Sequence, residues 1–344
     1  MRHRWFVSLG ALAIVLAVIT QSSWLAGAQS AAGAAAKPGR TWTPLRTPDG
    51  QFDLEGVWDF STITPLERPG GLGNKETFSD EEAASFEQEE NIRQNRDLID
   101  DKKGGLNYLP GSVVPYNEFW YERGSKIVGS KRTSLVVDPS DGRIPPMTRA
   151  GQQRVDAIAE AARDEQLGRV KADSWEDRSL ADRCILGFNA GPPMTPGAYN
   201  NHVQIFQSAG YVVLVTEMVH EARIIPVGGR LEPARFRTYK GDSKVRWDGR
   251  TLVTETSNFR RETSLRGSSS SMRLVERLTR VDADSLVYEF TVDDPKTWTK
   301  PWTVAVPMKK VLEPMYEYAC HEGNYALPNI LRGARVQERR EAGK

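Results

Sequence analysis

The chain has 344 residues, with 46 Lys or Arg side chains against 45 Asp or Glu, which gives a formal net charge of +1. A near-neutral balance without a basic block argues against nucleic acid as a partner. The length allows one large domain or two small ones.

The first 28 residues have the features of an export signal. Arg2 and Arg4 make the start basic, residues 5–19 are apolar, and residues 26–28 read Ala-Gly-Ala, an A-x-A cleavage site. The apolar run is short for a membrane span, which needs about 20 residues. We therefore expect a mature protein in the periplasm or secreted, without membrane association after cleavage; an uncleaved anchor is the alternative. Cleavage removes two Arg and no acid, so 44 basic side chains face 45 acidic ones and the charge becomes −1.

The mature chain divides into a linker, one domain and a tail. Residues 29–50 are rich in Ala, Gly and Pro and are expected to form a flexible linker. A single β-barrel domain with helical additions is expected over 51–335, and residues 336–344 are expected to be frayed. The first strand lies within 52–60, where Gly56-Val57-Trp58 resembles the G-x-W signature that opens lipocalin-like barrels. In those barrels the Trp closes one end.

Two helices are predicted before the main run of strands. Ser79 and Glu82 form a capping box that starts a very polar surface helix reaching about residue 101. Residues 148 to about 170 predict a second helix, since apolar residues recur there at near-helical spacing.

The most informative stretch is 196–227, where a dense apolar run holds several ionisable side chains. Ser208-Ala209-Gly210 interrupts the run, which predicts two strands joined by a tight turn. Alternation along the second strand puts His220 on one face with Thr216 and Met218. It puts Glu217 on the other face with Val219, Glu221 and Arg223.

Six further strands follow at regular spacing: 243–247, 251–256, 272–281, 286–292, 298–310 and 316–321. Asp248-Gly249 between the first two is a strong hairpin signal. Short strands in this rhythm favour an antiparallel barrel or sandwich over an α/β fold. The predicted fold class is mainly β, an antiparallel lipocalin-like β-barrel with a few peripheral helices.

Cys184 and Cys320 are the only cysteines. In an oxidising compartment such a pair is expected to form a disulfide. Two separate buried thiols, or a catalytic Cys320 beside His321, are the alternatives. A bridge would hold His321 near the loop that precedes residue 196.

Several short motifs of the sequence resemble those of a family of secreted bacterial proteins that has no characterised activity. They span roughly residues 54–335 and comprise 132–139, 191–194, 199–201, 216–220, 246–249, 292–295 and 318–325. The resemblance implies a lipocalin-like barrel with helical additions and brings no activity, cofactor or site residue with it.

The ionisable residues predict acid–base chemistry on a small organic molecule by a lyase, isomerase or hydrolase. The candidate catalytic residues are His202, Glu217, His220 and His321, since imidazole titrates near neutral pH and a carboxylate can tune it. We expect His220 to face a cavity shared with His202 or His321. Candidate substrate-binding residues, with Arg223 placed to orient an anionic group, are Arg223, Tyr199, Asn200, Trp247 and Glu322.

Alternative functions remain open. No Gly-rich loop leads from a strand into a helix, so no organic cofactor is predicted, and the absence of G-x-S-x-G gives a nucleophilic serine little support. Three histidines and a carboxylate could bind zinc or iron, although no H-E-x-x-H spacing occurs. A lipocalin-like carrier of an apolar or sugar ligand is the main rival, because several aromatics could line a barrel pocket: Trp247, Tyr288, Phe290, Trp298 and Trp302. The simpler interpretation of these aromatics is barrel core.

Overall fold

The computed structural model describes residues 42–100, 102–105, 110, 116–166, 172–187, 189–233 and 235–343. The predicted export signal lies outside these residues, as does the first part of the predicted linker. Within the described residues, no helix is both long and apolar enough to cross a membrane.

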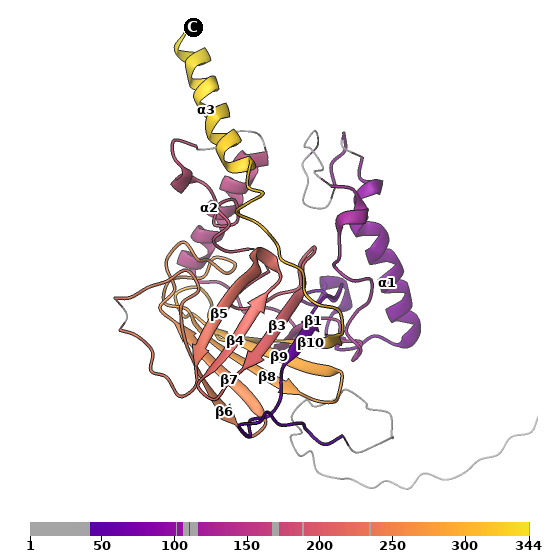
Figure 1. The fold of residues 1–344 in the computed structure, drawn as a ribbon. Coiled ribbons are helices and arrows are strands. Elements are labelled where there is room, and N and C mark those ends of the chain that lie inside the picture. Colours follow the sequence, from indigo (N-terminus) through magenta and orange to yellow (C-terminus); the bar gives the residue numbers. More distant parts are fainter. Residues whose placement is uncertain are drawn as a thin grey trace, which may run out of the picture. The chain divides into compact units, whose positions relative to one another are not determined.

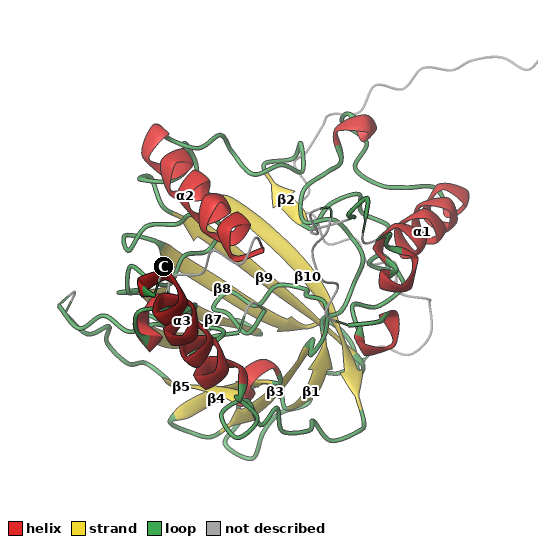
Figure 2. Cartoon of the chain, turned by 90° about the horizontal axis from the view of Figure 1, so that it is seen from above, coloured by secondary structure: helices red, strands yellow, loops and turns green. Residues whose placement is uncertain are grey.

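The described chain forms a nearly closed antiparallel barrel (Figure 1), which confirms the predicted fold class. The strand order is β5-β4-β3-β1-β10-β9-β8-β7-β6. On the side away from β9, β10 pairs with β2 near its start and with β1 near its end. The strands are β1 (Gly56–Asp59), β2 (Val136–Asp138), β3 (His202–Gln207), β4 (Tyr211–Thr216), β5 (Glu221–Pro226), β6 (Asp242–Asp248), β7 (Thr251–Ser257), β8 (Arg273–Arg280), β9 (Ser285–Asp293) and β10 (Trp302–Val311). The α-helices of the described residues are α1 (Asp80–Gln94), α2 (Arg149–Gln166) and α3 (Ala326–Ala342). Figure 2 shows these helices outside the curved wall of strands.

The barrel closes at a seam between β5 and β6. Their backbones run parallel and meet at one bridge, Val227 with Val245, where the Gly228 amide donates to the Val245 carbonyl at 2.9 Å. Side chains complete the seam, since the Lys240 ammonium contacts the Glu221 carboxylate and the Ala222 carbonyl. The seam is therefore held mainly by side chains, unlike every other junction along the barrel.

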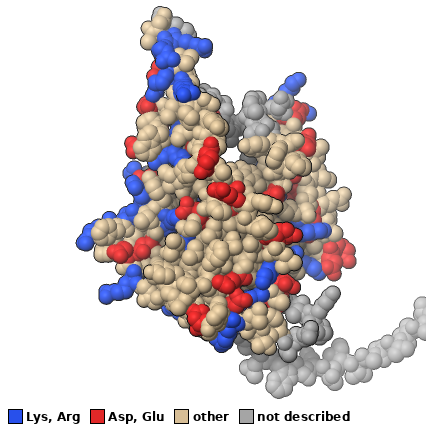
Figure 3. Space-filling view, in the orientation of Figure 1, with Lys and Arg blue, Asp and Glu red and all other residues tan. Residues whose placement is uncertain are grey.

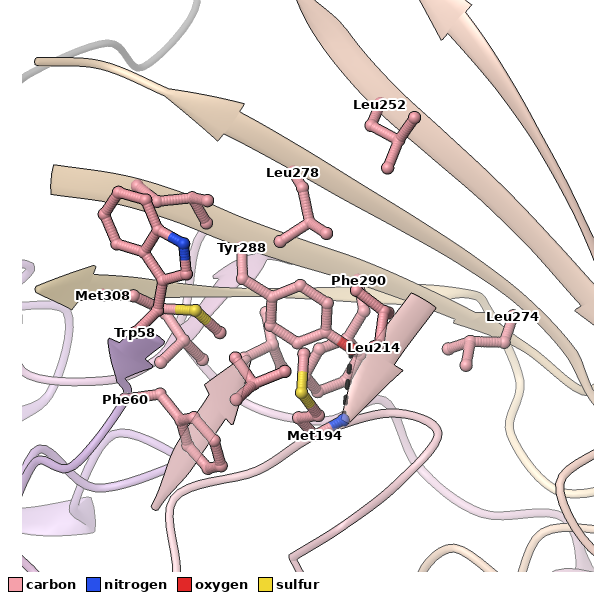
Figure 4. Packing of buried hydrophobic residues seen from close by; sticks show 14 of the residues in the cluster. Trp58, Phe60, Met194, Leu214, Leu252, Leu274, Leu278, Tyr288, Phe290 and Met308 are labelled. Carbon is pink, nitrogen blue, oxygen red and sulfur yellow. Dashed lines mark hydrogen bonds between the residues drawn. The ribbon is translucent and has the colours of Figure 1, made fainter. Parts of the chain in front are cut away.

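Side chains fill the barrel interior (Figure 4). Alternate residues of each strand point inward because the pleat sends neighbours to opposite faces, as the burial of every second residue in β8 and β9 records. The loop before β3 adds Met194, which is 1 % exposed and lies against Tyr288. Four predicted pocket aromatics are core, as their simpler interpretation had it: Tyr288, Phe290, Trp298 and Trp302 are all at most 1 % exposed.

Trp58 occupies the barrel near the end where β1 begins. It is fully buried, and its indole Nε1 donates to the Leu54 carbonyl at 2.9 Å. The Arg280 guanidinium lies 5.5 Å from the ring centroid and the Lys310 ammonium lies 6.0 Å away. Cations over an indole face are attracted by the ring quadrupole, so two strands distant in sequence are tied to the G-x-W segment.

The first helix begins where the sequence predicts and ends earlier. The Ser79 hydroxyl accepts from the Glu82 amide at 3.2 Å, and the Glu82 carboxylate accepts from the Ser79 amide at 2.8 Å, so the capping box is confirmed. The helix stops at Gln94 rather than near 101, because Asn95 is extended and its side chain caps a 3-10 turn over Arg96–Leu98.

Two strand predictions are wrong. The second strand of the predicted hairpin ends at Thr216, and a turn leads into the separate strand β5. Val219 and His220 have φ values of 63° and 51°, a left-handed conformation outside the β region, so the strand is interrupted here. Residues 316–321 form no strand, and most of the predicted frayed tail at 336–344 belongs to α3.

Candidate functional site

The disulfide predicted from the cysteine count is present. Cys184 and Cys320 are joined, with Cα atoms 5.8 Å apart. Asn324 strengthens the junction by donating to the Asp182 carbonyl at 2.7 Å. The bridge excludes a catalytic Cys320 thiolate. It leaves His321 and the neighbouring Glu322 exposed.

His202 and Glu217 form the one close pair among the predicted catalytic residues. His202 opens β3, and Glu217 follows the last residue of β4 on the neighbouring strand. The Glu217 amide donates to the His202 carbonyl at 2.9 Å, which fixes the two backbones side by side. Their side chains meet on the outer wall of the barrel, with His202 Nδ1 2.7 Å from Glu217 Oε2. We call this pair the His202–Glu217 dyad.

Other carboxylates surround the dyad. Asp59 on β1 is the direct cross-strand neighbour of His202, and Glu122 lies close enough to act on its charge. The hydrogen bond to Glu217 raises the pKa of His202, and the charges of Glu217, Asp59 and Glu122 add to this against the opposing effect of burial. His202 is thus held as an imidazolium to a higher pH than a free histidine.

Glu217 is tuned in the opposite direction. Its side chain is 12 % exposed, and burial alone would raise its pKa. Hydrogen bonds from His202 and from the Asn200 side chain overcome burial and lower the pKa. Asn200, predicted to bind substrate, therefore supports the dyad. Tyr199 packs edge-on against Tyr121 with ring centroids 6.2 Å apart.

His220 does not join the dyad. It lies on the turn between β4 and β5 and is exposed, so the prediction that it faces a cavity with His202 or His321 is wrong. The physical reason is the left-handed turn, which strand alternation could not anticipate. Among the described residues, no group of three or more His, Cys, Asp and Glu side chains is arranged to hold a metal ion.

A second polar cluster lies inside the barrel and was largely missed by sequence reasoning. Arg223 on β5 reaches across the interior to Glu276 on β8, with Nη1 3.0 Å from Oε1 and Nη2 2.7 Å from Oε2. The Tyr288 hydroxyl donates to the same Oε1 at 2.7 Å and accepts from the Met194 amide at 3.1 Å. Arg223 and Glu276 are 6 % and 2 % exposed.

The polar groups of this interior cluster already make hydrogen bonds to other side chains of the barrel. Arg223 Nη2 also contacts the hydroxyls of Ser243 and Thr256 at 3.2 and 3.3 Å. Burial raises the pKa of Tyr288 well above its usual value, so the phenol stays a neutral donor. The guanidinium predicted to orient a substrate anion is thus bidentate to an internal carboxylate. The sequence feature that could have revealed this cluster is Glu276, a charged residue that alternates with the buried Leu274 and Leu278 on the inward face of β8.

Two surface cavities lie elsewhere. A groove of about 620 Å³ runs along the outer wall of β7–β9, and a smaller one of about 480 Å³ lies beside α1. Neither is lined by a predicted site residue. Trp247, the remaining predicted binding residue, is half-buried and donates through Nε1 to Gln51 Oε1 at 3.2 Å.

Comparison of the chain with protein-family models, with curated proteins and with solved structures finds no match in any of the three.

Proposed function

We propose that this protein is an exported proton-transfer enzyme that uses the His202–Glu217 dyad without an organic cofactor. The observation that carries the proposal is the 2.7 Å contact between His202 Nδ1 and Glu217 Oε2. Within the described residues His202 Nε2 makes no hydrogen bond, and the His202 side chain is 28 % exposed. An imidazole oriented through one nitrogen and open at the other is the arrangement that general acid–base catalysis uses.

The dyad divides the work between two residues. Glu217 stays ionised and fixes the ring, while His202 donates a proton from Nε2 and later recovers it. Because its pKa is raised, His202 stays protonated to a higher pH than a free histidine, which suits it to act first as an acid that protonates a leaving oxygen or a developing carbanion. Those steps belong to lyase, isomerase and hydrolase reactions. The carboxylates of Asp59 and Glu122 favour a small substrate that carries hydrogen-bond donors or positive charge.

Substrate screening with site variants tests this function. The exported protein is assayed against panels of small lyase, isomerase and hydrolase substrates. His202→Gln, which keeps a polar side chain of similar size, should lower kcat/KM by about 100-fold or more. Glu217→Gln should shift the pH profile to lower pH, because the His202 pKa loses its main support. Loss of activity in His220→Gln with full activity in His202→Gln would move the chemistry to the turn and overturn the proposal.

The groove on the outer wall favours a second candidate, a binding protein without catalysis. Polar side chains outnumber apolar ones along it, among them Arg237, Asn258, Ser270, Arg273 and Thr291. Such a lining suits a polar ligand such as a sugar, whereas the barrel interior that would hold an apolar ligand is filled by side chains such as Met194. Calorimetric titration with mono- and oligosaccharides, compared between the native chain and Arg273→Ala, tests this candidate.

A further inference from the structure

The outer wall of the barrel changes character around its circumference. On β6–β9 the outward positions carry the mixed charges of a solvated surface: Lys244, Arg246, Asp248, Glu255, Arg273, Arg277, Glu289 and Asp293. On β3–β5, beyond the His202–Glu217 dyad, no outward position is charged. The residues there, which we call the β3–β5 patch, are Gln204, Phe206, Tyr211, Val213, Val215, Ala222 and Ile224.

Large apolar groups of the patch are open to solvent. Phe206, Tyr211 and Ile224 are 45 %, 52 % and 67 % exposed. In Figure 3, which looks onto this wall, the middle of the view is uncharged and acidic or basic side chains lie around it. In a chain of which 26 % is charged, an outer wall of three strands without a charge is a marked departure. Charge depletion with exposed aromatics is the composition of an interface core.

The strand register orders the patch into rows. Phe206, Val213 and Ile224 are cross-strand neighbours on β3, β4 and β5. Gln204, Val215 and Ala222 form the next row toward the dyad. Each row is therefore centred on a valine of β4, with a large side chain on the β3 side.

We infer that the β3–β5 patch is the interface of a homodimer in which the two barrels pack wall to wall about a two-fold axis parallel to β4. A two-fold interface presents the same surface on both sides, so any charge near its centre would face a like charge. The patch has none. A different protein with a charged face would find no complementary charge here, which favours a second copy as the occupant.

The rows fit this symmetry. A two-fold axis along β4 keeps each row level and places β3 of one protomer against β5 of the other. Val213 then meets the partner's Val213, and Phe206 meets the partner's Ile224. In the next row the long Gln204 lies over the small side chain of the partner's Ala222. Two sheet faces packed in this way lie about 10 Å apart with nearly aligned strands.

The interface adjoins the proposed catalytic dyad without including it. The dyad lies at the end of the patch, one residue pair beyond the row of Gln204 and Val215, and both copies keep it. Loss of the dimer and loss of activity are therefore separate measurements.

Oligomeric state tests the inference directly. Sedimentation velocity and light scattering of the native chain over a concentration series should give a dimer. Ile224→Lys would bury an uncompensated ammonium twice per dimer, so it should weaken association by about 100-fold or more. The matched control is Val287→Lys, which places the same charge at an outward position of β9 on the charged wall and should leave the dimer intact.

A cysteine variant tests the geometry without disturbing the wall. Because the native cysteines are joined to each other, Val213→Cys adds a single free thiol at the position that meets its own copy. A short bismaleimide cross-linker should join it to its own copy, whereas Val287→Cys should not be joined; sheets about 10 Å apart leave the two Cα atoms too distant for a direct disulfide. A native chain that is monomeric at every concentration overturns the inference, as does a dimer that Ile224→Lys leaves intact. A monomer that sediments with neutral phosphatidylcholine vesicles overturns it as well and assigns the patch to lipid.

Discussion

The buried Arg223–Glu276 pair predicts a strong and asymmetric response to substitution. Glu276→Gln removes one charge and leaves the Arg223 guanidinium in the barrel interior, where both side chains are nearly inaccessible. Breaking a buried pair from one side costs about 3–5 kcal/mol, because the remaining charge is desolvated without compensation. We therefore expect the free energy of unfolding to fall by about 3–5 kcal/mol in Glu276→Gln.

The double substitution Arg223→Met with Glu276→Leu should restore most of that loss. It replaces both charges by apolar groups of similar length, and such replacements are often neutral or stabilising. The Tyr288 hydroxyl would still accept from the Met194 amide at 3.1 Å, but it would lose Glu276 Oε1 as the acceptor of its own proton, which keeps the recovery incomplete. If the double variant is as unstable as Glu276→Gln, the single loss does not arise from an unpaired charge.

The assay is urea denaturation followed by tryptophan fluorescence, with the midpoint and slope fitted together. A matched control is Glu255→Gln on β7, since Glu255 pairs with Lys244 at 3.0 Å on the outer wall and is 36 % exposed. Exposed pairs contribute about 0–1 kcal/mol. An equal loss in Glu255→Gln and Glu276→Gln would refute the argument from burial.

Three further predictions concern the disulfide, the dyad and the barrel end. Reduction of the Cys184–Cys320 bridge, which spans 136 residues, should destabilise the protein by roughly 5 kcal/mol in the chain-entropy model, as urea midpoints with and without reductant would record. The pKa of His202 is raised by folding, so its contribution to the free energy of unfolding is complete below about pH 6.5 and is lost as pH rises through the folded pKa. The pKa of Glu217 is lowered, so its contribution is present above about pH 4.5 and is lost as pH falls through the folded pKa. Unfolding free energies measured across pH should show both slopes in the native chain, and their persistence in His202→Gln would contradict this assignment. Trp58→Ala, at a fully buried side chain, should cost about 3–5 kcal/mol by thermal or urea unfolding.

The fold was largely predictable because it depends on local patterns. Alternating apolar residues and an Asp-Gly turn located β6 and β7 to within about one residue of their observed ends. The capping box of α1 was readable because both of its hydrogen bonds join residues three apart. The turn after Thr216 was not readable, because Val219 gives no sequence sign that it will take a positive φ.

The sequence by itself determined the mainly β class, the approximate place of most strands along the chain, and the partners of a disulfide that had only one possible pairing. Only the tertiary structure decided which polar groups meet. Strand register put His202 beside Glu217, and barrel closure put Arg223 opposite Glu276, 53 residues later in the chain. Local patterns set which face a side chain takes, because the pleat repeats every two residues. Contacts across a barrel depend on how far the whole sheet curves before it closes, and no short stretch of sequence carries that information.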